Sequence, residues 1–232
     1  MHGPEESSDH FFTSFTDLLV GVIFLFILLL MVFALNLKKK DEKPEPTVTT
    51  EEVRAELLEE MGRRMQSREA SVQLDLANGI IRLPEGLLFD SGQWQLSPQG
   101  EQVVQQLAEV LEELLPCAAR SAEPCQWKPQ PIALDSVLVE GHTDHRPFAD
   151  AHGNGNWELS AFRAITVYKT LVAAKPALEQ GMVNTGNQPL LGVSAYADRR
   201  PVDTKHLDPN RRIDIRFNMH ATDVKAPESA HE

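Results

Sequence analysis

The longest pattern in the chain is an apolar segment near its N-terminus, residues 11–37, which carries a single charge, Asp17. From Leu18 to Leu37 no residue is charged, and Asn36 is the only polar one. As a helix rising about 1.5 Å per residue, this run would extend roughly 30 Å, the hydrocarbon thickness of a bilayer. It also lacks the polar stripe of a helix at a protein surface. The pattern therefore predicts a transmembrane helix over 11–37, after a short N-terminal segment, 1–10.

After the apolar segment the pattern becomes that of a linker, 38–70, which contains one helix. Thr49 and Glu52 form a capping-box sequence ahead of apolar residues at every fourth position, and this predicts a helix over about 50–69. Its apolar stripe suggests packing on a second copy or on the domain that follows. A solvated linker helix is an equal alternative.

Residues 71–217 alternate between strand and helix patterns. An Asn-Gly pair at 78–79 between two alternating runs predicts a β-hairpin, and Ser97 followed by Pro98 marks the start of a helix. The remaining patterns predict a helix at about 157–174 and three strands at about 134–140, 191–196 and 213–217. We therefore expect an α/β fold, an α/β sandwich with helices on one face of a mixed sheet. A flexible tail, 218–232, follows.

The composition excludes one large class of partner. The chain has 232 residues and a formal net charge of −12. Nucleic-acid binding depends on clustered Lys and Arg that release counterions from phosphates, and so acidic a chain is poorly suited to it. We expect no nucleic-acid partner.

Two cysteines, Cys117 and Cys125, lie eight residues apart in a proline-rich stretch. In an oxidising compartment they could form a disulfide that closes a small loop, with a stabilisation of roughly 2–3 kcal/mol. The alternative is two unconnected thiols. Two cysteines alone do not make a zinc site.

Asp17 is the candidate functional residue of the apolar segment. A carboxylate near the bilayer centre costs about 2.5–3.5 kcal/mol, so such a residue usually has a purpose. Asp17 could cap the helix at the headgroup level, where the helix dipole stabilises negative charge. It could instead accept and release a proton or sodium ion inside a helix bundle. The residues alone leave both alternatives open.

Asp144 and Arg163 are the candidate binding residues of the domain. Asp144 follows a predicted strand at its carboxyl edge, where open α/β sheets bind ligands, and Arg163 on the next helix can point to the same edge. Such a pair can hold a zwitterionic ligand, each charged contact contributing roughly 1.5–3 kcal/mol. No nucleophile with an attendant base accompanies them, so we expect binding and no enzyme activity. His142, His145 and His152 match no common metal motif, and we predict no metal ligands.

The chain contains three sequence motifs, of which the first includes Asp144 and the second includes Arg163. They are Thr143-Asp144, Asn-x-x-Leu-Ser-x-x-Arg-Ala at 156–164, and Asn-Arg-Arg at 210–212. In this combination, over about 71–217, the chain resembles the OmpA-like peptidoglycan-binding domain. The resemblance implies that Asp144 and Arg163 clamp the ammonium and carboxylate of the peptide-stem residue diaminopimelate. It further implies that three residues line the same pocket, Asn156, Leu159 and Arg212. It implies no cofactor.

Two stretches depart from the usual pattern of that family. His-Arg-Pro at 145–147 follows the aspartate where the family usually has glycine, and Ala-Tyr-Ala-Asp at 195–198 replaces a Gly-x-Gly sequence. These departures affect the shape of the loops and the ligand preference.

The sequence Ser-Phe-Thr-Asp at 14–17, ahead of an apolar helix and an OmpA-like domain, resembles the MotB-type stator subunits of ion-driven motors. The resemblance implies that Asp17 carries the transported proton or sodium ion. It also implies a dimer inside a ring of a multispanning MotA/ZorA-like membrane subunit.

The same resemblance implies a bacterial inner-membrane protein with a cytoplasmic N-terminus and a periplasmic C-terminal domain. Lys38–Lys40 favour the opposite orientation by the positive-inside rule. We give the domain identity priority, because it rests on many residues. The short acidic start looks most like the B subunit of the Zorya antiphage-defence motor. A flagellar-type stator subunit and a passive peptidoglycan anchor are the alternatives.

Overall fold

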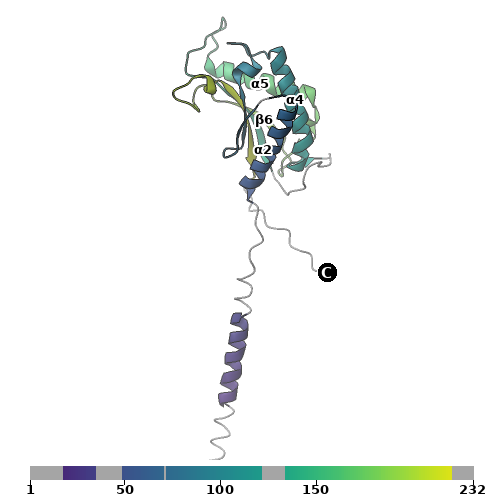
Figure 1. The fold of residues 1–232 in the computed structure, drawn as a ribbon, viewed down its shortest axis with the longest axis vertical. Coiled ribbons are helices and arrows are strands. Elements are labelled where there is room, and N and C mark those ends of the chain that lie inside the picture. The colour runs from purple at the N-terminus through teal and green to yellow at the C-terminus, as the bar shows by residue number, and fades with distance from the viewer. Residues whose placement is uncertain (1–17, 35–48, 71, 122–133, 221–232) are drawn as a thin grey trace, which may run out of the picture. The chain divides into compact units, whose positions relative to one another are not determined.

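The structure, a computed structural model, describes residues 18–34, 49–70, 72–121 and 134–220 (Figure 1). The chain divides into two compact units, Met1–Thr47 and Val48–Glu232. We describe each unit by itself.

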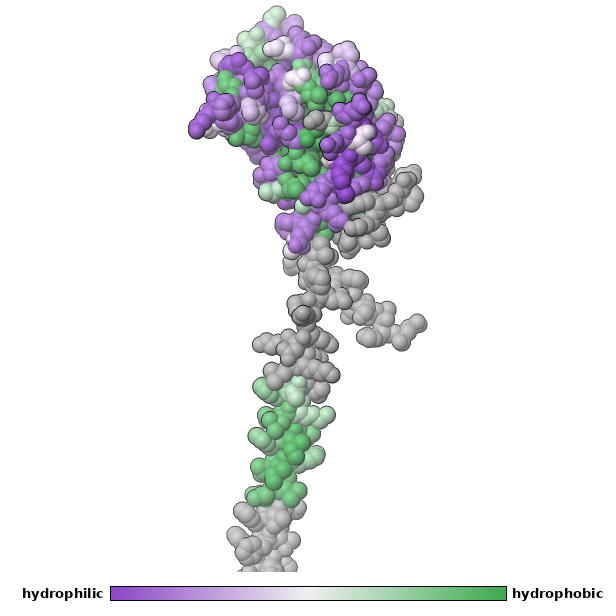
Figure 2. All heavy atoms as spheres, in the orientation of Figure 1, coloured by the Kyte–Doolittle hydropathy of each residue, from purple (hydrophilic) through white to green (hydrophobic). Residues whose placement is uncertain are grey.

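In the first unit, residues 18–34 form a helix whose apolar side chains are exposed along its whole length (Figure 2). The remainder of the predicted transmembrane segment, including Asp17, lies outside the described residues. Among the residues that the structure describes, no helix combines the length and the apolarity needed to cross a membrane. The transmembrane helix therefore stays a prediction.

The second unit is built on a five-stranded sheet with the strand order β1-β2-β7-β4-β6. The strands are β1 (Gln73–Asp75), β2 (Ile80–Pro84), β4 (Leu134–His142), β6 (Leu191–Ala195) and β7 (Arg212–Met219). Neighbouring strands are antiparallel except for β4 and β6, which are parallel. The predicted mixed sheet is thus confirmed. Two very short strands, β3 (Arg120–Ser121) and β5 (Met182–Val183), form a separate pair that the patterns did not predict.

Three long helices pack against the sheet and one another: α2 (Thr50–Ser67), α4 (Pro98–Leu114) and α5 (Asn156–Ala174) (Figure 1). The described part of the domain also contains four short helical segments: α3 (Glu85–Leu88), η1 (Leu115–Cys117), α6 (Ala177–Gln180) and η2 (Asp208–Asn210). One apolar core runs between the sheet and the helices. This arrangement confirms the predicted α/β fold.

Local sequence signals account for the ends of several elements. The Asn-Gly turn joins β1 to β2, and Gly79 has a φ of +67°, a conformation that glycine adopts without strain. Ser97 Oγ accepts the Gly100 N–H at 3.0 Å, and Pro98 is the first residue of α4. The predicted hairpin and helix start are both confirmed.

Helix α2 belongs to the folded domain. Its capping box is complete, because Thr49 Oγ accepts the Glu52 N–H at 3.2 Å and Glu52 Oε2 accepts the Thr49 N–H at 2.8 Å. Leu57, Leu58 and Met61 are fully buried in the common core. Of the alternatives that the pattern left open, the structure shows packing on the domain that follows.

Cys117 is buried at the end of η1 and is disulfide-bonded. Its predicted partner, Cys125, lies outside the described residues. The pairing of these two cysteines therefore stays a prediction.

The alternation of side chains along β7 separates two environments. Ile213, Ile215 and Phe217 are buried in the apolar core. Arg212 and Asp214 point to the other face of the sheet, since successive side chains of a strand alternate between faces.

The sheet and α5 are in close backbone contact at Gly141. A Cβ atom at this position would lie 2.0 Å from the backbone oxygen of Ser160, so only glycine fits. The Thr143 N–H beyond it donates to the Ala197 carbonyl at 2.8 Å. The contact at Gly141 fixes the end of β4 against the first turns of α5, and the bond from Thr143 joins it to the segment after β6.

We predict that Gly141→Ala lowers the free energy of unfolding of the domain by about 1–3 kcal/mol, because the added methyl group must displace backbone atoms. The measurement is chemical denaturation of the full-length chain. Gly86→Ala is the matched control, since a Cβ there meets nothing within 4 Å. Equal stability of the two variants would contradict the close packing of β4 on α5.

Candidate functional site

A cavity of about 280 Å³ lies beside the end of β4 and the start of α5. Four of the predicted binding residues line it, namely Asp144, Asn156, Leu159 and Arg163. The cavity also contains three charged side chains that the sequence did not indicate for this site, Glu85, Arg146 and Arg211.

Asp144 is almost fully buried, and its carboxylate accepts four hydrogen bonds. Oδ1 accepts the backbone N–H of Arg146 at 2.9 Å. Oδ2 accepts Nε and Nη2 of Arg146 at 2.9 and 2.6 Å, and Nη1 of Arg211 at 2.8 Å. Burial opposes ionisation, but hydrogen bonds from the two arginines outweigh it and hold the pKa of Asp144 at about 2.

Arg163 extends from α5 into the same cavity but pairs with a different carboxylate. Its Nη2 donates to Glu85 Oε1 at 2.5 Å, and its Nε donates to the Gln93 carbonyl at 2.8 Å. The guanidinium lies 5.1 Å from the centre of the Phe89 ring. Burial lowers the pKa of Arg163 below its usual range although Glu85 opposes the shift. Asp144 and Arg163 thus line one cavity, each with its own partner.

Arg211 connects the two halves of the site. It donates to Glu85 Oε2, to Asp144 Oδ2 at 2.8 Å and to Asp208 Oδ1 at 2.7 Å. Burial opposes its charge, but these three carboxylates raise the pKa of Arg211 above its usual range. The result is an alternating chain of charges, which we call the charge chain: Arg146, Asp144, Arg211, Glu85 and Arg163. It carries one net positive charge.

Asn156 and Leu159 shape the cavity from the first turns of α5. Asn156 Nδ2 donates to the carbonyl of Arg146 at 2.9 Å and to that of Asp144 at 3.3 Å. This amide therefore holds the loop that carries both charged residues. Leu159 is buried and supplies an apolar wall.

Arg212 does not line the cavity, in contrast to the expectation from the motif. It is buried on the other face of the sheet, where its Nε donates to Asp214 Oδ2 at 2.9 Å and its Nη2 to the Arg200 carbonyl at 3.2 Å. Arg211 occupies the cavity position instead. The physical reason is the strand alternation, which directs neighbouring residues to opposite sides.

A second group of buried charges lies around Arg212. His142 Nε2 lies 3.7 Å from both Glu140 Oε2 and Asp214 Oδ2, and its ring stacks on Tyr196. Burial lowers the pKa of His142 below its usual range, although the carboxylate of Glu140 opposes the shift.

This second group resembles a metal site by its residue types alone. One ligand atom from each of Glu140, His142 and Asp214 lies within 4.8 Å of the others. Three arginines already donate to the two carboxylates, however: Arg82, Arg212 and Arg216. Their positive charge opposes a bound cation, so we assign no metal to this group.

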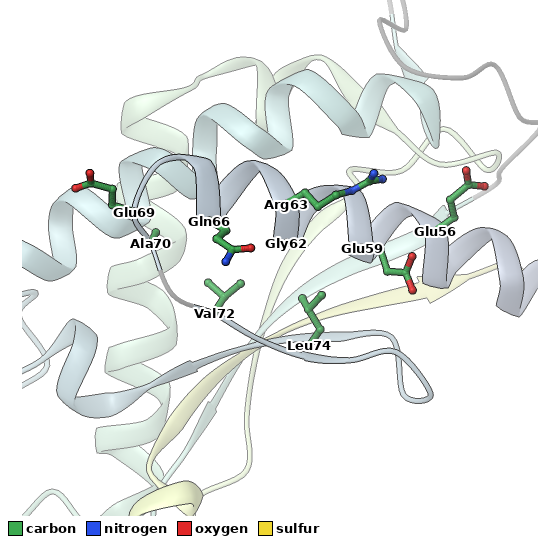
Figure 3. A pocket seen from close by; sticks show the side chains of 9 residues that line it. All are labelled: Glu56, Glu59, Gly62, Arg63, Gln66, Glu69, Ala70, Val72 and Leu74. Carbon is green, nitrogen blue, oxygen red and sulfur yellow. The ribbon is translucent and has the colours of Figure 1, made fainter.

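A larger cavity, of about 800 Å³, lies between α2 and β1 (Figure 3). Val72 and Leu74 project toward the helix, and Glu59 and Arg63 stand among the polar groups of the helix side. The cavity contains none of the residues predicted for binding. Its size alone gives it no function.

The lowered pKa of Asp144 predicts a pH dependence of stability. Folding lowers this pKa from an ordinary value of 3.8 to about 2, so the ionised carboxylate stabilises the folded state above pH 4. That stabilisation is lost as the pH falls through about 2. We expect the free energy of unfolding of wild type to approach that of Asp144→Asn as the pH falls from about 6 to 2.5. Urea denaturation of the full-length chains measures the difference, and a constant difference would contradict the assignment.

No model of a known protein family matches the chain. An uncharacterised protein of Bacillus subtilis strain 168, YtxE, is 25% identical over 242 residues, covering 90% of this chain and 88% of that protein. The structure of the cell wall anchor of the T6SS from Pseudomonas aeruginosa is 20% identical with a TM-score of 0.47, covering 72% of this chain and 99% of that one.

The similarity that establishes the fold is to a crystal structure from Desulfovibrio vulgaris. That protein, a putative MotB like protein, superposes with a TM-score of 0.51 at 20% identity, over 73% of this chain and 96% of that one. The chain therefore contains a domain with the fold of this MotB-like protein.

Proposed function

We propose that the second unit is a peptidoglycan-binding domain that holds the diaminopimelate residue of the peptide stem in the 280 Å³ cavity. The observation that carries the proposal is the charge chain, which places carboxylates and guanidinium groups within one small cavity. A zwitterionic amino acid offers the matching ammonium and carboxylate. Charge-assisted hydrogen bonds of this kind are stronger than neutral ones.

The cavity is suited to binding without chemistry. Thr143 is the hydroxyl residue next to Asp144, and its Oγ1 is buried without a hydrogen-bond partner, so no base activates it as a nucleophile. The carboxylates of Asp144 and Glu85 are both occupied by arginines. General acid–base catalysis needs a carboxyl group free to exchange a proton, whereas the lowered pKa of Asp144 keeps that group ionised.

We predict that Asp144→Asn weakens binding to isolated peptidoglycan sacculi by at least about ten-fold. The amide keeps the shape of the side chain but loses a charged contact of roughly 1.5–3 kcal/mol. Sedimentation of the full-length protein with sacculi measures the effect. Glu101→Gln, an exposed carboxylate on α4, is the matched control. Equal binding by wild type and Asp144→Asn would refute the site.

We further propose that the first unit anchors the chain in the bacterial inner membrane. The apolar sequence of residues 11–37 and the exposed apolar helix at 18–34 support this proposal. The N-terminus would be cytoplasmic and the peptidoglycan-binding domain periplasmic. Two copies would pair inside a ring of a MotA/ZorA-like subunit, with Asp17 as the carrier of a proton or sodium ion. The similarity of the second unit to a MotB-like protein agrees with a stator subunit.

The setting that we propose is a Zorya-type antiphage-defence motor. The acidic residues ahead of the apolar segment, Glu5, Glu6 and Asp9, support this choice over a flagellar-type stator subunit. In such a motor, ion passage at Asp17 would drive rotation of the partner ring around a dimer fixed to the cell wall. A charge moved through a potential of 100 mV supplies about 2.3 kcal/mol.

We predict that Asp17→Asn abolishes protection in a phage-plaque assay of the complete operon, at matched protein level and with the membrane complex intact. The amide cannot carry an ion, whereas it can still cap a helix. Full protection by the variant would leave a passive peptidoglycan anchor as the function. An absence of protection by wild type would contradict the defence setting, and a motility assay would follow.

A further inference from the structure

Arg146 occupies the carboxylate that a ligand ammonium would need. Its Nε and Nη2 both donate to Asp144 Oδ2, and its backbone N–H donates to Oδ1. Arg211 supplies a further donor to Oδ2. Three of these four donors converge on Oδ2, so an ammonium group can reach that oxygen only by displacing one of them.

Arg146 is the donor that can leave. Its side chain is 59% exposed, whereas those of Arg211 and Arg163 are 26% and 3% exposed. Asp144 is the only carboxylate paired with Arg146 among the ion pairs of the described residues, while Arg211 is held by three carboxylates. Water can solvate the exposed guanidinium of Arg146 when it leaves, and Asp144 keeps Arg211 as a partner. Departure of the less exposed Arg211 would instead break ion pairs with three carboxylates at once.

The loop backbone does not have to move when Arg146 leaves. The carbonyl of Arg146 is fixed by Asn156 Nδ2 at 2.9 Å, and its N–H remains on Asp144. The guanidinium can therefore swing into solvent by side-chain rotation while the carboxylate stays in place. Asp144 then presents one face of Oδ2 to the cavity.

We propose that Arg146 is an internal competitor that decides how readily the site accepts an amine-bearing ligand. This inference rests on the proposed function, because it assumes that the ligand ammonium binds Asp144. The guanidinium occupies the carboxylate in the free protein and must leave before an ammonium can bind. Binding is thus weakened by the fraction of molecules in which Arg146 is in place.

The test is isothermal titration calorimetry of the full-length chain, purified in detergent, with meso-diaminopimelate and with pimelate. Pimelate keeps both carboxylates but lacks the amines. We expect Arg146→Ala to bind meso-diaminopimelate roughly five-fold more tightly than wild type, if Arg146 is in place in about four-fifths of the free molecules. The same variant should gain nothing toward pimelate, and Arg146→Lys should remain close to wild type.

Arg63→Ala is the matched control. Its side chain is 68% exposed and pairs with one carboxylate, Glu60, at 2.7 Å on α2, and it does not line the 280 Å³ cavity. It should bind both compounds as wild type does, which separates the local effect from a change in net charge.

Three results would overturn the inference. Unchanged or weaker binding of meso-diaminopimelate by Arg146→Ala, with wild-type binding measurable, would make Arg146 a bystander or a ligand contact and leave the proposed function standing. An equal gain toward pimelate would show a general electrostatic effect. If neither wild type nor Arg146→Ala binds meso-diaminopimelate, the inference and the proposed binding of this compound both fail.

Discussion

The alternation of positive and negative side chains across the small cavity is the constraint on which the site depends. Its members come from α3, the loop after β4, α5 and the residue before β7, so the charges tie four segments together. Buried charges are tolerated when opposite charges accompany them, and Asp144, Arg211 and Glu85 each lie between two oppositely charged partners. Loss of Asp144 would leave Arg146 without its partner in the charge chain, and loss of Glu85 would do the same to Arg163. The arrangement is therefore held by charge pairing as well as by the apolar core.

The scaffold below the cavity sets where these charges can meet. The backbone contact at Gly141 brings β4 against α5, and the register of β7 against β2 and β4 decides the direction of each arginine. Arg211 and Arg212 differ by one position in sequence, yet one lines the cavity and the other is buried among the charges of the opposite face. A shift of one residue in strand register would exchange these environments.

Much of the fold could be predicted because its signals are local. The Asn-Gly turn, the cap at Ser97 and the capping box at Thr49 each involve residues within four positions of one another. Asp144 and Arg163 could be found because a strand end and the next helix determine their place. Glu85 could not, since its partners Arg163 and Arg211 lie 78 and 126 residues away in the sequence. The exchange of Arg212 for Arg211 was missed for a related reason, because a motif does not specify on which side of the strand each residue lies.

The inclusion of α2 in the folded domain limits how far the domain can reach. Counted to residue 70, the connection after the apolar segment would have more than thirty residues and an extended length of about 100 Å. With α2 folded into the core, only residues 35–48 separate the two described helices. At 3.3–3.6 Å per residue this tether spans at most about 50 Å. If the chain is anchored in a membrane as proposed, any wall polymer that it holds must come within that distance plus the size of the folded domain, and the spacing between membrane and wall itself becomes a condition for binding.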